Sequence, residues 1–419
     1  MKPLTRRLAA VLVGTAILAL TGIAAAGPAD ATAPVVVTAA LGSAAKPVAA
    51  VSDAAGSVYV LNEGDATVSK ITPGGALTRV FAALGTAASP QAMTIDPKGY
   101  LFVACAGTDS VTRISPTGTV IAYWAYDGVG SMPRGITSDA SGSVFVSNWG
   151  TSTITRIEAT GRVVPVFARL DSADRPLGLA TDAAGNLYVA ETQTDRISKV
   201  SASGAVREAF AVLPKGPGAP TGPVAVAVDP WGTVYVASTR GLSTFATDGS
   251  VLKAEVTLPA GPHHPTGVLL DAFGDAFVPD ELSGGVTVVD AAGGAATSIA
   301  DFGHGSIVRA VALAGSGFFA ADYGSGAIVR VELSPTLASA PLATTIRRGV
   351  ETALDVTATG LAPRVLASVG VLPPGLILDE STGRISGTPT TPGTYAFDLV
   401  AVNHWGATPA QHEVLAVTG

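Results

Sequence analysis

Residues 182–200, "DAAGNLYVAETQTDRISKV", contain a turn, an apolar run of strand length and a single acid, Glu191, where the run ends. The pattern D-x-x-G-x-[VL]-[YF]-V recurs along the chain, with starts 43, 43, 43, 47 and 42 residues apart. Five full copies begin at Asp53, Asp96, Asp139, Asp182 and Asp229, a weaker one begins at Asp271, and a degenerate seventh has Leu313 in the Asp position. Self-similarity at such a period is the mark of a repeat architecture.

Each copy holds four apolar pieces of strand length, which in the fourth copy are "LGLAT", "NLYVA", "RISKV" and "AVREAFAVL". The D-x-x-G between the first two pieces predicts a tight hairpin, because Asp accepts bonds from nearby backbone amides and Gly supplies a positive φ. Four strands per repeat predict an all-β fold, a seven-bladed β-propeller, in preference to a solenoid, whose ends stay open. We expect one aromatic column to pack between blades: Tyr59, Phe102, Phe145, Tyr188, Tyr235, Phe277 and Phe319.

Two segments compete to close the ring. The outer strands read "GALTRVFAAL" (75–84), "GRVVPVFARL" (161–170) and "GAVREAFAVL" (204–213), and "TAPVVVTAAL" (32–41) fits the same register although it precedes the first repeat. We therefore expect residues 32–41 to supply the outer strand of blade seven. The alternative is "PTLASAPLAT" (335–344), arriving from the other end.

The N-terminus has the features of a secretory signal peptide. Lys2, Arg6 and Arg7 precede an apolar run from about Leu8 to Ala26, which predicts cleavage after Ala26 or Ala31. A retained membrane anchor is the alternative, because the run is close to spanning length. We expect residues 1–31 to be removed and the protein to be secreted or associated with the cell surface.

The composition argues against nucleic-acid binding and excludes an intramolecular disulfide. The remaining 22 basic and 31 acidic residues give a net charge of −9, and the absence of basic runs argues against nucleic-acid binding. The single cysteine, Cys105, excludes an intramolecular disulfide, so core burial has to stabilise the fold.

Repeats such as "PLGLATDAAGNLYVAETQTDRISKV" (176–200) resemble NHL repeats and the related propellers of virginiamycin B lyases and gluconolactonases. The resemblance covers about residues 34–335, with the propeller assigned to 32–336. It implies the propeller fold but not one activity, because these propellers serve as binding modules, lyases and lactonases. Virginiamycin B lyases are expected to use a histidine with metal-binding glutamates, a pattern that does not map residue by residue onto this chain.

Residues 341–419 break the repeat and contain "LPPGLILDESTGRISGTPTTPGTYAFDLVAVN" (372–403). This segment closely resembles the bacterial "Putative Ig domain", a cadherin-like β-sandwich of secreted proteins. "TYAFDLVAV" alternates as a sandwich strand does. The resemblance implies a spacer or adhesion module. The scattered Asp355, Asp379, Glu380 and Asp398 do not predict a calcium site, which needs six or more oxygen ligands.

The residue three past each aromatic forms a mostly polar column at the end of the second strand: Asn62, Cys105, Asn148, Glu191, Ser238, Asp280 and Asp322. One hypothesis is a ring of oxygen ligands (Asn62, Asn148, Glu191, Asp280 and Asp322) for one divalent cation, Ca²⁺ or Mg²⁺. The other is strand-end capping, in which these groups bond loop amides.

The loops before the first strands add further polar residues to the same expected face. "SMPRG" (131–135), "GPHHP" (261–265) and "FGHG" (302–305) contribute Arg134, His263, His264 and His304. Together with the acids they form a candidate acid–base or metal site. Trp149 and Tyr323 lie beside them in sequence and suit a shelf for a sugar or peptide.

Several catalytic classes lack their motif. G-x-S-x-G is absent, no phosphate-binding glycine loop precedes a helix, and Cys105 has apolar neighbours rather than an activating base. The leading hypothesis is a secreted, non-enzymatic binding or scaffold protein whose propeller face binds a peptide, a glycan or an extracellular protein. A metal-dependent lyase or lactonase at the channel mouth is the alternative, and an extracellular sensor module is a third.

Overall fold

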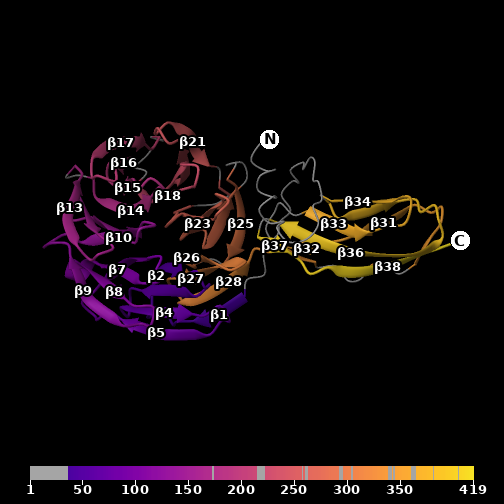
Figure 1. Cartoon of the computed structure of the whole chain (residues 1–419), viewed down its shortest axis with the longest axis horizontal. Coiled ribbons are helices and arrows are strands. Elements are labelled where there is room, and N and C mark those ends of the chain that lie inside the picture. The colour runs from indigo at the N-terminus through magenta and orange to yellow at the C-terminus, as the bar shows by residue number, and fades with distance from the viewer. Residues whose placement is uncertain are drawn as a thin grey trace. The chain divides into compact units, whose positions relative to one another are not determined.

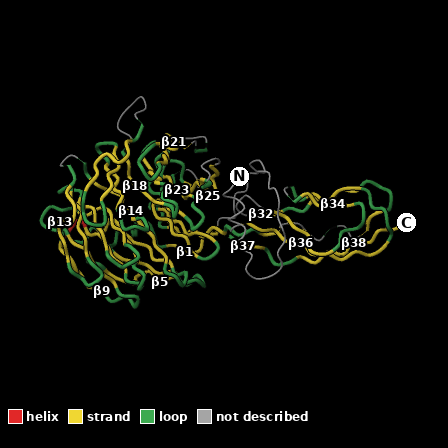
Figure 2. Tube along the Cα trace, turned by 45° about the horizontal axis from the view of Figure 1, so that its top comes forward, coloured by secondary structure: helices red, strands yellow, loops and turns green. Residues whose placement is uncertain are grey.

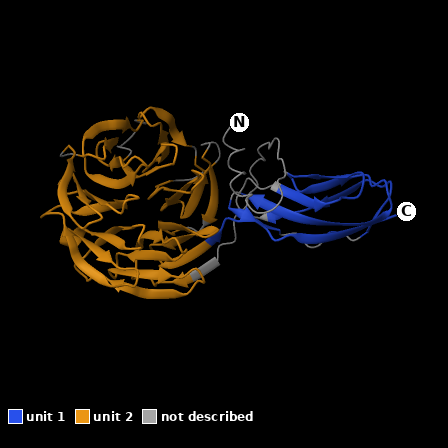
Figure 3. Ribbon diagram, in the orientation of Figure 1, with its two compact units in different colours: residues 1–34, 331–419 blue, residues 35–330 orange. Residues whose placement is uncertain are grey.

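The computed structural model describes residues 36–171, 174–214, 222–256, 258–259, 263–291, 296–302, 305–337, 342, 345–359, 365–380, 382–403 and 405–419. The described chain divides into two compact units, residues 35–330 and 331–419 (Figure 3). Strands and loops make up nearly all of it (Figure 2), and the one helical segment among the described residues is the 3₁₀ turn η1 (Ala106–Thr108). None of the helical structure in these ranges is long and apolar enough to cross a membrane. The expected signal peptide, residues 1–31, lies outside the described residues.

The first unit is a ring of seven four-stranded antiparallel sheets (Figure 1). Blade 1 contains β2 (Pro47–Ser52), β3 (Val58–Asn62), β4 (Thr67–Ile71) and β5 (Leu77–Ala83). Blade 2 contains β6 (Pro90–Ile95), β7 (Leu101–Cys105), β8 (Ser110–Ile114) and β9 (Val120–Tyr126). Blade 3 contains β10 (Pro133–Ser138), β11 (Val144–Asn148), β12 (Thr153–Ile157) and β13 (Val163–Arg169). Blade 4 contains β14 (Pro176–Thr181), β15 (Leu187–Glu191), β16 (Arg196–Val200) and β17 (Val206–Val212). Blade 5 contains β18 (Pro223–Val228), β19 (Val234–Ser238), β20 (Gly241–Phe245) and β21 (Val251–Val256). Blade 6 contains β22 (Leu269–Leu270), β23 (Ala276–Asp280), β24 (Gly285–Val289) and β25 (Ala296–Asp301). Blade 7 contains β26 (Val308–Ala314), β27 (Gly317–Asp322), β28 (Ala327–Glu332) and β1 (Val36–Ala40).

The N-terminal strand closes the ring. β1 pairs antiparallel with β28, with Val37 opposite Val329 and Ala40 opposite Ala327, so blade 7 takes its outer strand from the start of the chain. The competing segment is not used there, because β29 (Thr336–Leu337) pairs with β32 (Ala358–Thr359) of the second unit. The first strand and the last three strands of the propeller therefore hold each other in place.

The aromatic column forms the core between blades, as predicted. All seven rings are at most 5% exposed. Tyr188 packs with Val234 and Val236 of the next blade, and Phe319 packs with Val58 and Val60 across the closure. Each blade is thus stabilised by burying its aromatic against an apolar face of its neighbour, which presents Val58 and Val60 to Phe319 but Phe318 to Phe277.

The D-x-x-G turns have the predicted geometry. Asp182 Oδ1 accepts bonds from the amides of Ala184 at 3.0 Å and Asn186 at 2.8 Å. Gly185 has φ +78°. The same amide pair, two and four residues on, bonds to Asp53, Asp96, Asp139, Asp229 and Asp271. The Asp column is therefore structural.

The second unit is the predicted β-sandwich. One sheet has the order β30-β38-β36-β33 with β37 beside β36, and the other has the order β31-β35-β34. Its strands are β30 (Thr345–Arg347), β31 (Thr352–Asp355), β33 (Val365–Gly370), β34 (Leu376–Asp379), β35 (Arg384–Gly387), β36 (Gly393–Asn403), β37 (Gly406–Ala407) and β38 (Gln411–Thr418). Phe397, Leu399 and Ala401 alternate inward along β36, and with Ile385 and Leu415 they form the core.

One position of the propeller core carries an unexpected charge. The residue that follows the outer strand is a buried leucine in four blades: Leu41, Leu84, Leu170 and Leu213. In blade 2 this residue is Asp127, whose amide makes the equivalent bond to the carbonyl before the third strand. Neither of its carboxylate oxygens makes a hydrogen bond of normal geometry to a described residue. Burial, together with the charge of Asp109, raises the pKa of Asp127 to about 7.

Removing the closing strand should loosen blade 7 first. A chain that begins at Gly42 exposes the outer edge of β28, so we expect amide hydrogen exchange in β27 and β28 to accelerate while β11 and β15 stay protected. The comparison is with a chain that begins at Thr32. Equal protection of β28 in both chains would contradict the role given to β1.

The Asp127→Asn variant should be less sensitive to pH. Between pH about 4 and 7 the unfolded chain has lost a proton that the folded chain keeps, so the wild type loses stability as pH rises and levels off above 7. A pKa unit corresponds to about 1.4 kcal/mol. When pH rises from 4 to 8, the free energy of unfolding of the variant, measured with urea, should therefore increase by about 2–4 kcal/mol relative to that of the wild type. Exposed Asp65→Asn serves as the control; the same slope in all three proteins would refute the assignment.

Candidate functional site

The first strands of the blades surround a cavity of about 700 Å³ along the axis of the propeller. Its wall includes a small residue two positions after the proline that begins or precedes the first strand in each of blades 1 to 6: Ala49, Ala92, Gly135, Gly178, Ala225 and Gly267. A Cβ on Gly135 would lie 2.0 Å from the carbonyl oxygen of Leu177, and one on Gly178 would lie 2.7 Å from Cα of Ala225. Small residues are therefore required where neighbouring first strands approach closely.

The residue before each of those small residues lies at the mouth of the cavity. These residues, which we call the inner rim, are Val48, Gln91, Arg134, Leu177, Val224, Thr266 and Arg309. Leu177 and Val224 give blades 4 and 5 an apolar side. Arg309, Gln91 and Arg134 give blades 7, 2 and 3 a polar side.

A second set of mouth residues, the outer rim, directly follows the predicted polar column: Glu63, Ala106, Trp149, Thr192, Thr239, Glu281 and Tyr323. Glu63, Glu281 and Tyr323 line the cavity. The sequence prediction therefore selected a column one residue too early for the mouth. Successive side chains of a strand point in opposite directions, so a step of one residue exchanges a position inside the blade for one at the channel.

Charged groups of blades 6, 7 and 1 are paired across the mouth. Glu281 Oε1 lies 2.8 Å from His264 Nδ1, and Arg309 donates from Nη2 to Glu281 Oε2 at 3.0 Å. The Arg309 guanidinium also lies 4.4 Å from the ring centroid of Tyr323, whose hydroxyl donates to Glu63 Oε2 at 3.4 Å. The two carboxylates of the mouth are thus already neutralised or hydrogen-bonded.

The chain of contacts continues through blades 2, 3 and 4. Gln91 bridges Glu63 and Arg134: its Nε2 lies 3.5 Å from Glu63 Oε1, and its Oε1 accepts from Arg134 Nη1 at 2.8 Å. Arg134 and Arg175 both stack on Trp149, with guanidinium carbons 5.7 Å and 4.3 Å from the ring centroid. Arg134 and Tyr323 line the cavity, and Trp149 contacts Arg134 beside it.

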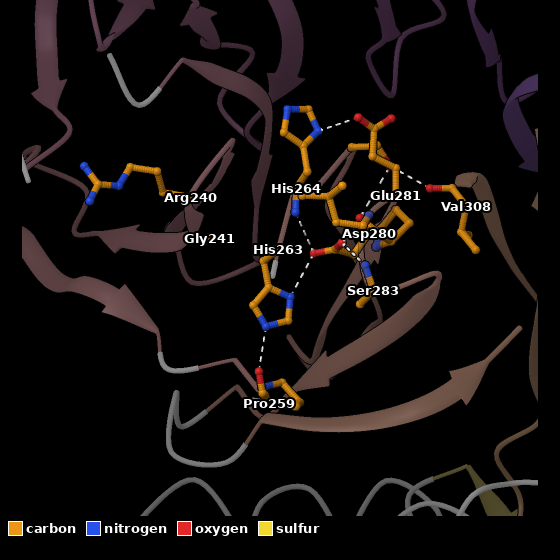
Figure 4. Close-up of polar contacts among 12 residues, drawn as sticks. Arg240, Gly241, Pro259, His263, His264, Asp280, Glu281, Ser283 and Val308 are labelled. Carbon is orange, nitrogen blue, oxygen red and sulfur yellow. Dashed lines mark hydrogen bonds and ion pairs between the residues drawn. The ribbon is translucent and has the colours of Figure 1, made fainter. Parts of the chain in front are cut away.

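His263 lies below the mouth and is fully engaged (Figure 4). Its Nδ1 is 3.0 Å from Asp280 Oδ2, and its Nε2 is 2.6 Å from the carbonyl oxygen of Pro259. Both ring nitrogens therefore contact protein oxygens, and these contacts hold the ring in place. The other oxygen of Asp280 accepts from the amides of Leu282 and Ser283. Figure 4 shows the His264 ring directed the other way, toward Glu281.

The polar column itself faces into the blades. Asn62 donates to Thr67 and Ser69 at 2.9 Å, and Asn148 donates to Thr153 and Thr155, so both bond the third strand of their own blade. Ser238 donates to the carbonyl of Gly241.

Asp322 and Cys105 are also occupied within their own blades. Burial raises the pKa of Asp322, but bonds from Ser325 and from the amides of Ile307 and Gly324 outweigh it and hold the pKa below the ordinary value. Burial raises the pKa of the Cys105 thiol, which keeps it protonated and unsuited to act as a nucleophile.

Glu191 belongs to an ionic cluster that replaces the neutral residues of other blades. Arg196 donates from Nε to Glu191 Oε2 at 3.1 Å and also bonds Asp174, and the side chains of both acids are fully buried. At the equivalent positions blade 3 has Asn148, Thr153 and Ser131. Burial raises the pKa of Glu191, and the charge of Asp174 adds to this.

The predicted cation ring does not converge on one point. Within the described ranges, one set of three acid, histidine or cysteine ligand atoms lies within 4.8 Å of one another, and it consists of Asp171, Asp174 and Glu208. Glu191, Asp280 and Asp322 are each bonded within their own blade. Arg196 already contacts Asp171 and Asp174. The predicted oxygens thus do not form a common cage for one ion.

His304 lies outside the described residues. Sequence reasoning missed Glu63, Gln91, Arg175, Glu281 and Arg309 at the mouth. Two of them can be found by aligning the repeats. Gln91 and Arg309, like Arg134, interrupt a column that is otherwise Val, Leu or Thr.

The fold and the site define a seven-bladed β-propeller with a polar-sided mouth over a central cavity, in a chain that also contains an Ig-like sandwich. The chain belongs to the virginiamycin B lyase family, whose model matches residues 30–284. The "Putative Ig domain" model matches residues 331–418. No curated protein sequence matches the chain significantly.

Solved structures agree on the propeller. A streptogramin B lyase is 14% identical with a TM-score of 0.61, covering 69% of this chain and 93% of its own. A catalytically inactive variant of virginiamycin B lyase from Staphylococcus aureus with quinupristin is 16% identical with a TM-score of 0.62, covering 70% and 96%. The extracellular domain of a hybrid two-component system from B. thetaiotaomicron is 12% identical with a TM-score of 0.53, covering 89% and 57%. These identities establish the fold alone.

Breaking the cluster of blade 4 should destabilise the propeller. Arg196→Gln leaves Glu191 and Asp174 buried without their cation, so we expect a loss of about 3–5 kcal/mol in urea unfolding at neutral pH. The triple variant Asp174→Ser, Glu191→Asn, Arg196→Thr installs the residues of blade 3 and should recover most of that loss. A single variant as stable as wild type would show that the ion pairs are dispensable. A triple variant no more stable than the single would contradict the assignment of the loss to unpaired buried charge.

Proposed function

We propose that this protein is an extracellular, non-enzymatic binding protein whose channel mouth holds an amphipathic ligand, such as a peptide or a glycan with an apolar substituent. The observation that carries this proposal is the mouth itself, a cavity of about 700 Å³ with Leu177 and Val224 on one side and polar residues on the other, where Glu281 is already ion-paired. Cavities of this size are typical of small-ligand sites. The signal-like N-terminus and the extracellular relative support the location.

The contacts of the histidines favour binding over catalysis. Both ring nitrogens of His263 are engaged by oxygens of Asp280 and Pro259, so neither is left for a substrate proton while these contacts hold. Glu281 is held between His264 and Arg309. Such fixed polar groups orient a ligand at low entropic cost.

The two sides of the rim give the ligand its polarity. Leu177 and Val224 on blades 4 and 5 suit an apolar group, and the channel wall beneath them continues that surface. Glu281, Arg309 and Gln91 on the opposite side suit amide, hydroxyl or charged groups. The Ig-like unit serves as a spacer or adhesion module in this proposal.

A metal-dependent lyase is the second candidate, because the family and its solved relatives are named as lyases and because His264 and Glu281 meet at the mouth. Glu281 and His264 would supply two protein ligands to a cation such as Mg²⁺ or Ca²⁺, without a third acid or histidine ligand beside them among the described residues. Arg309 occupies Glu281 at present, so the site fits a cation only after that ion pair opens.

A ligand panel separates the two candidates. We expect residues 32–419 to bind members of a peptide and glycan array, and Leu177→Asp, which charges the apolar side of the rim, to weaken binding at least tenfold. Val80→Asp, on the exposed surface of β5, is the matched control. Turnover of quinupristin or of a lactone seen by mass spectrometry, abolished by Glu281→Gln, would overturn the binding proposal. Calorimetric binding of Mg²⁺, Ca²⁺, Mn²⁺ or Zn²⁺ below millimolar concentration, lost in the same variant, would support the lyase.

A further inference from the structure

Two arginines at one edge of the mouth have no acidic partner. The structure gives Arg134 a bond to the neutral Gln91 and gives Arg175 a bond from Nη1 to the carbonyl oxygen of Trp149 at 3.2 Å. Within the described ranges neither guanidinium forms an ion pair. Arg309 and Arg196, by contrast, are matched to Glu281 and to Glu191 with Asp174.

The indole of Trp149 holds these two cations together. Arg134 comes from the first strand of blade 3 and Arg175 from the residue before the first strand of blade 4, yet both lie over the same ring. Cation–π attraction offsets part of the repulsion between like charges, but it leaves the outward N–H groups of both guanidiniums without an anion. We call Arg134, Trp149 and Arg175 the arginine clamp.

The backbone fixes one arm of the clamp. Arg175 has φ +51° and precedes Pro176, a conformation shared by Lys46, Ser89 and Met132 at the same position of blades 1 to 3. A positive φ before proline is sparsely populated, so the surrounding blade must enforce it. Arg175 is the arginine among these four residues, and its guanidinium lies over the ring of Trp149.

We propose that the arginine clamp is a subsite for the carboxylate of a ligand seated in the channel mouth, such as a peptide C-terminus or a sugar acid. Guanidinium groups bind carboxylates through paired, charge-assisted N–H bonds, and Trp149 offers a flat surface for the adjoining part of the ligand. Arg134 lines the cavity, so a group held by the clamp stays continuous with the channel. This inference rests on the proposed binding function and names the ligand's charged group.

The neighbouring charges favour a carboxylate over a phosphate. Glu63 is only one side chain away from Arg134, through Gln91. A dianionic phosphate on the clamp would be repelled by that carboxylate more strongly than a monoanion. The clamp therefore suits a singly charged oxyanion.

Tryptophan indole signals of the whole protein give a direct test. The chain has four tryptophans, so ¹⁵N-indole labelling gives a simple spectrum in which Trp149→Phe assigns the Trp149 signal. The probes are N-acetylglycine, galacturonate and inorganic phosphate, titrated at constant ionic strength against chloride. We expect both carboxylates to shift the Trp149 signal saturably, with millimolar affinity and with less effect on the other three signals.

Substitutions decide the role of the arginines. Arg134→Gln and Arg175→Gln should each weaken N-acetylglycine binding roughly tenfold or more, since a charge-assisted bond is worth about 1.5–3 kcal/mol. Arg175→Lys should fall in between, because it keeps the charge but loses the planar fork. Arg162→Gln, an exposed arginine paired with Glu158, should bind as wild type does. Unchanged signals of the other tryptophans show that each variant is folded.

Each outcome has a separate meaning. Tighter binding of phosphate, equal shifts of all four indoles, or affinities of the glutamine variants equal to that of Arg162→Gln would overturn the carboxylate subsite. If the clamp fails but an array ligand still depends on Leu177, the proposed function survives without this subsite. If the carboxylates bind the clamp but no array ligand depends on the rim, the proposed function fails and the anion site stands.

Discussion

The packing of each blade's aromatic against the apolar second strand of the next blade is the contact on which the rest of the structure depends. A four-stranded antiparallel sheet has two faces to cover, and a ring of seven sheets covers both without an additional layer. Because every interface has the same form, the last must also be made between blade 7 and blade 1. There Phe319 packs with Val58 and Val60, and β1 adds the missing outer strand. Closure is thus built from the same apolar burial as every other interface.

Departures from that repeated interface are where the protein differs from an ideal propeller. Blade 2 has Asp127 in place of a core leucine, and blade 4 has an Arg–Glu–Asp cluster in place of Thr, Asn and Ser. A buried charge costs stability unless it is paired, so the two cases differ in kind. The ions of blade 4 neutralise one another in part, whereas the cost at Asp127 is reduced by a raised pKa. Blade 6 departs differently: its first strand is reduced to Leu269–Leu270, and the segment before it carries His263 and His264.

The mouth combines these local departures into one surface. Seven equivalent positions would give a symmetric ring, but substitutions place charged or polar side chains on blades 6, 7, 1, 2 and 3 and leave Leu177 and Val224 on blades 4 and 5. Arg309 on the polar side is paired with Glu281, whereas Arg134 and Arg175 form no ion pair with a described residue. An acidic chain that holds two such cations against one indole has kept a local site for an anion.

The sequence alone determined the architecture, because the 43-residue period, the D-x-x-G turns and the aromatic column are local patterns repeated several times. It also indicated the closing strand and the Ig-like unit, and it placed Arg134, Trp149, His264 and Tyr323 near the mouth. Only the tertiary structure decided which neighbour of each strand end faces the channel. Glu191 and Asp280 turn into their blades while Glu281 turns to the mouth, since alternate side chains of a strand point to opposite sides and a one-residue step reverses the direction. The partners of Glu191 were equally hidden, because Asp174 lies in the loop before β14 and Arg196 lies on β16, and they meet only when the blade is folded.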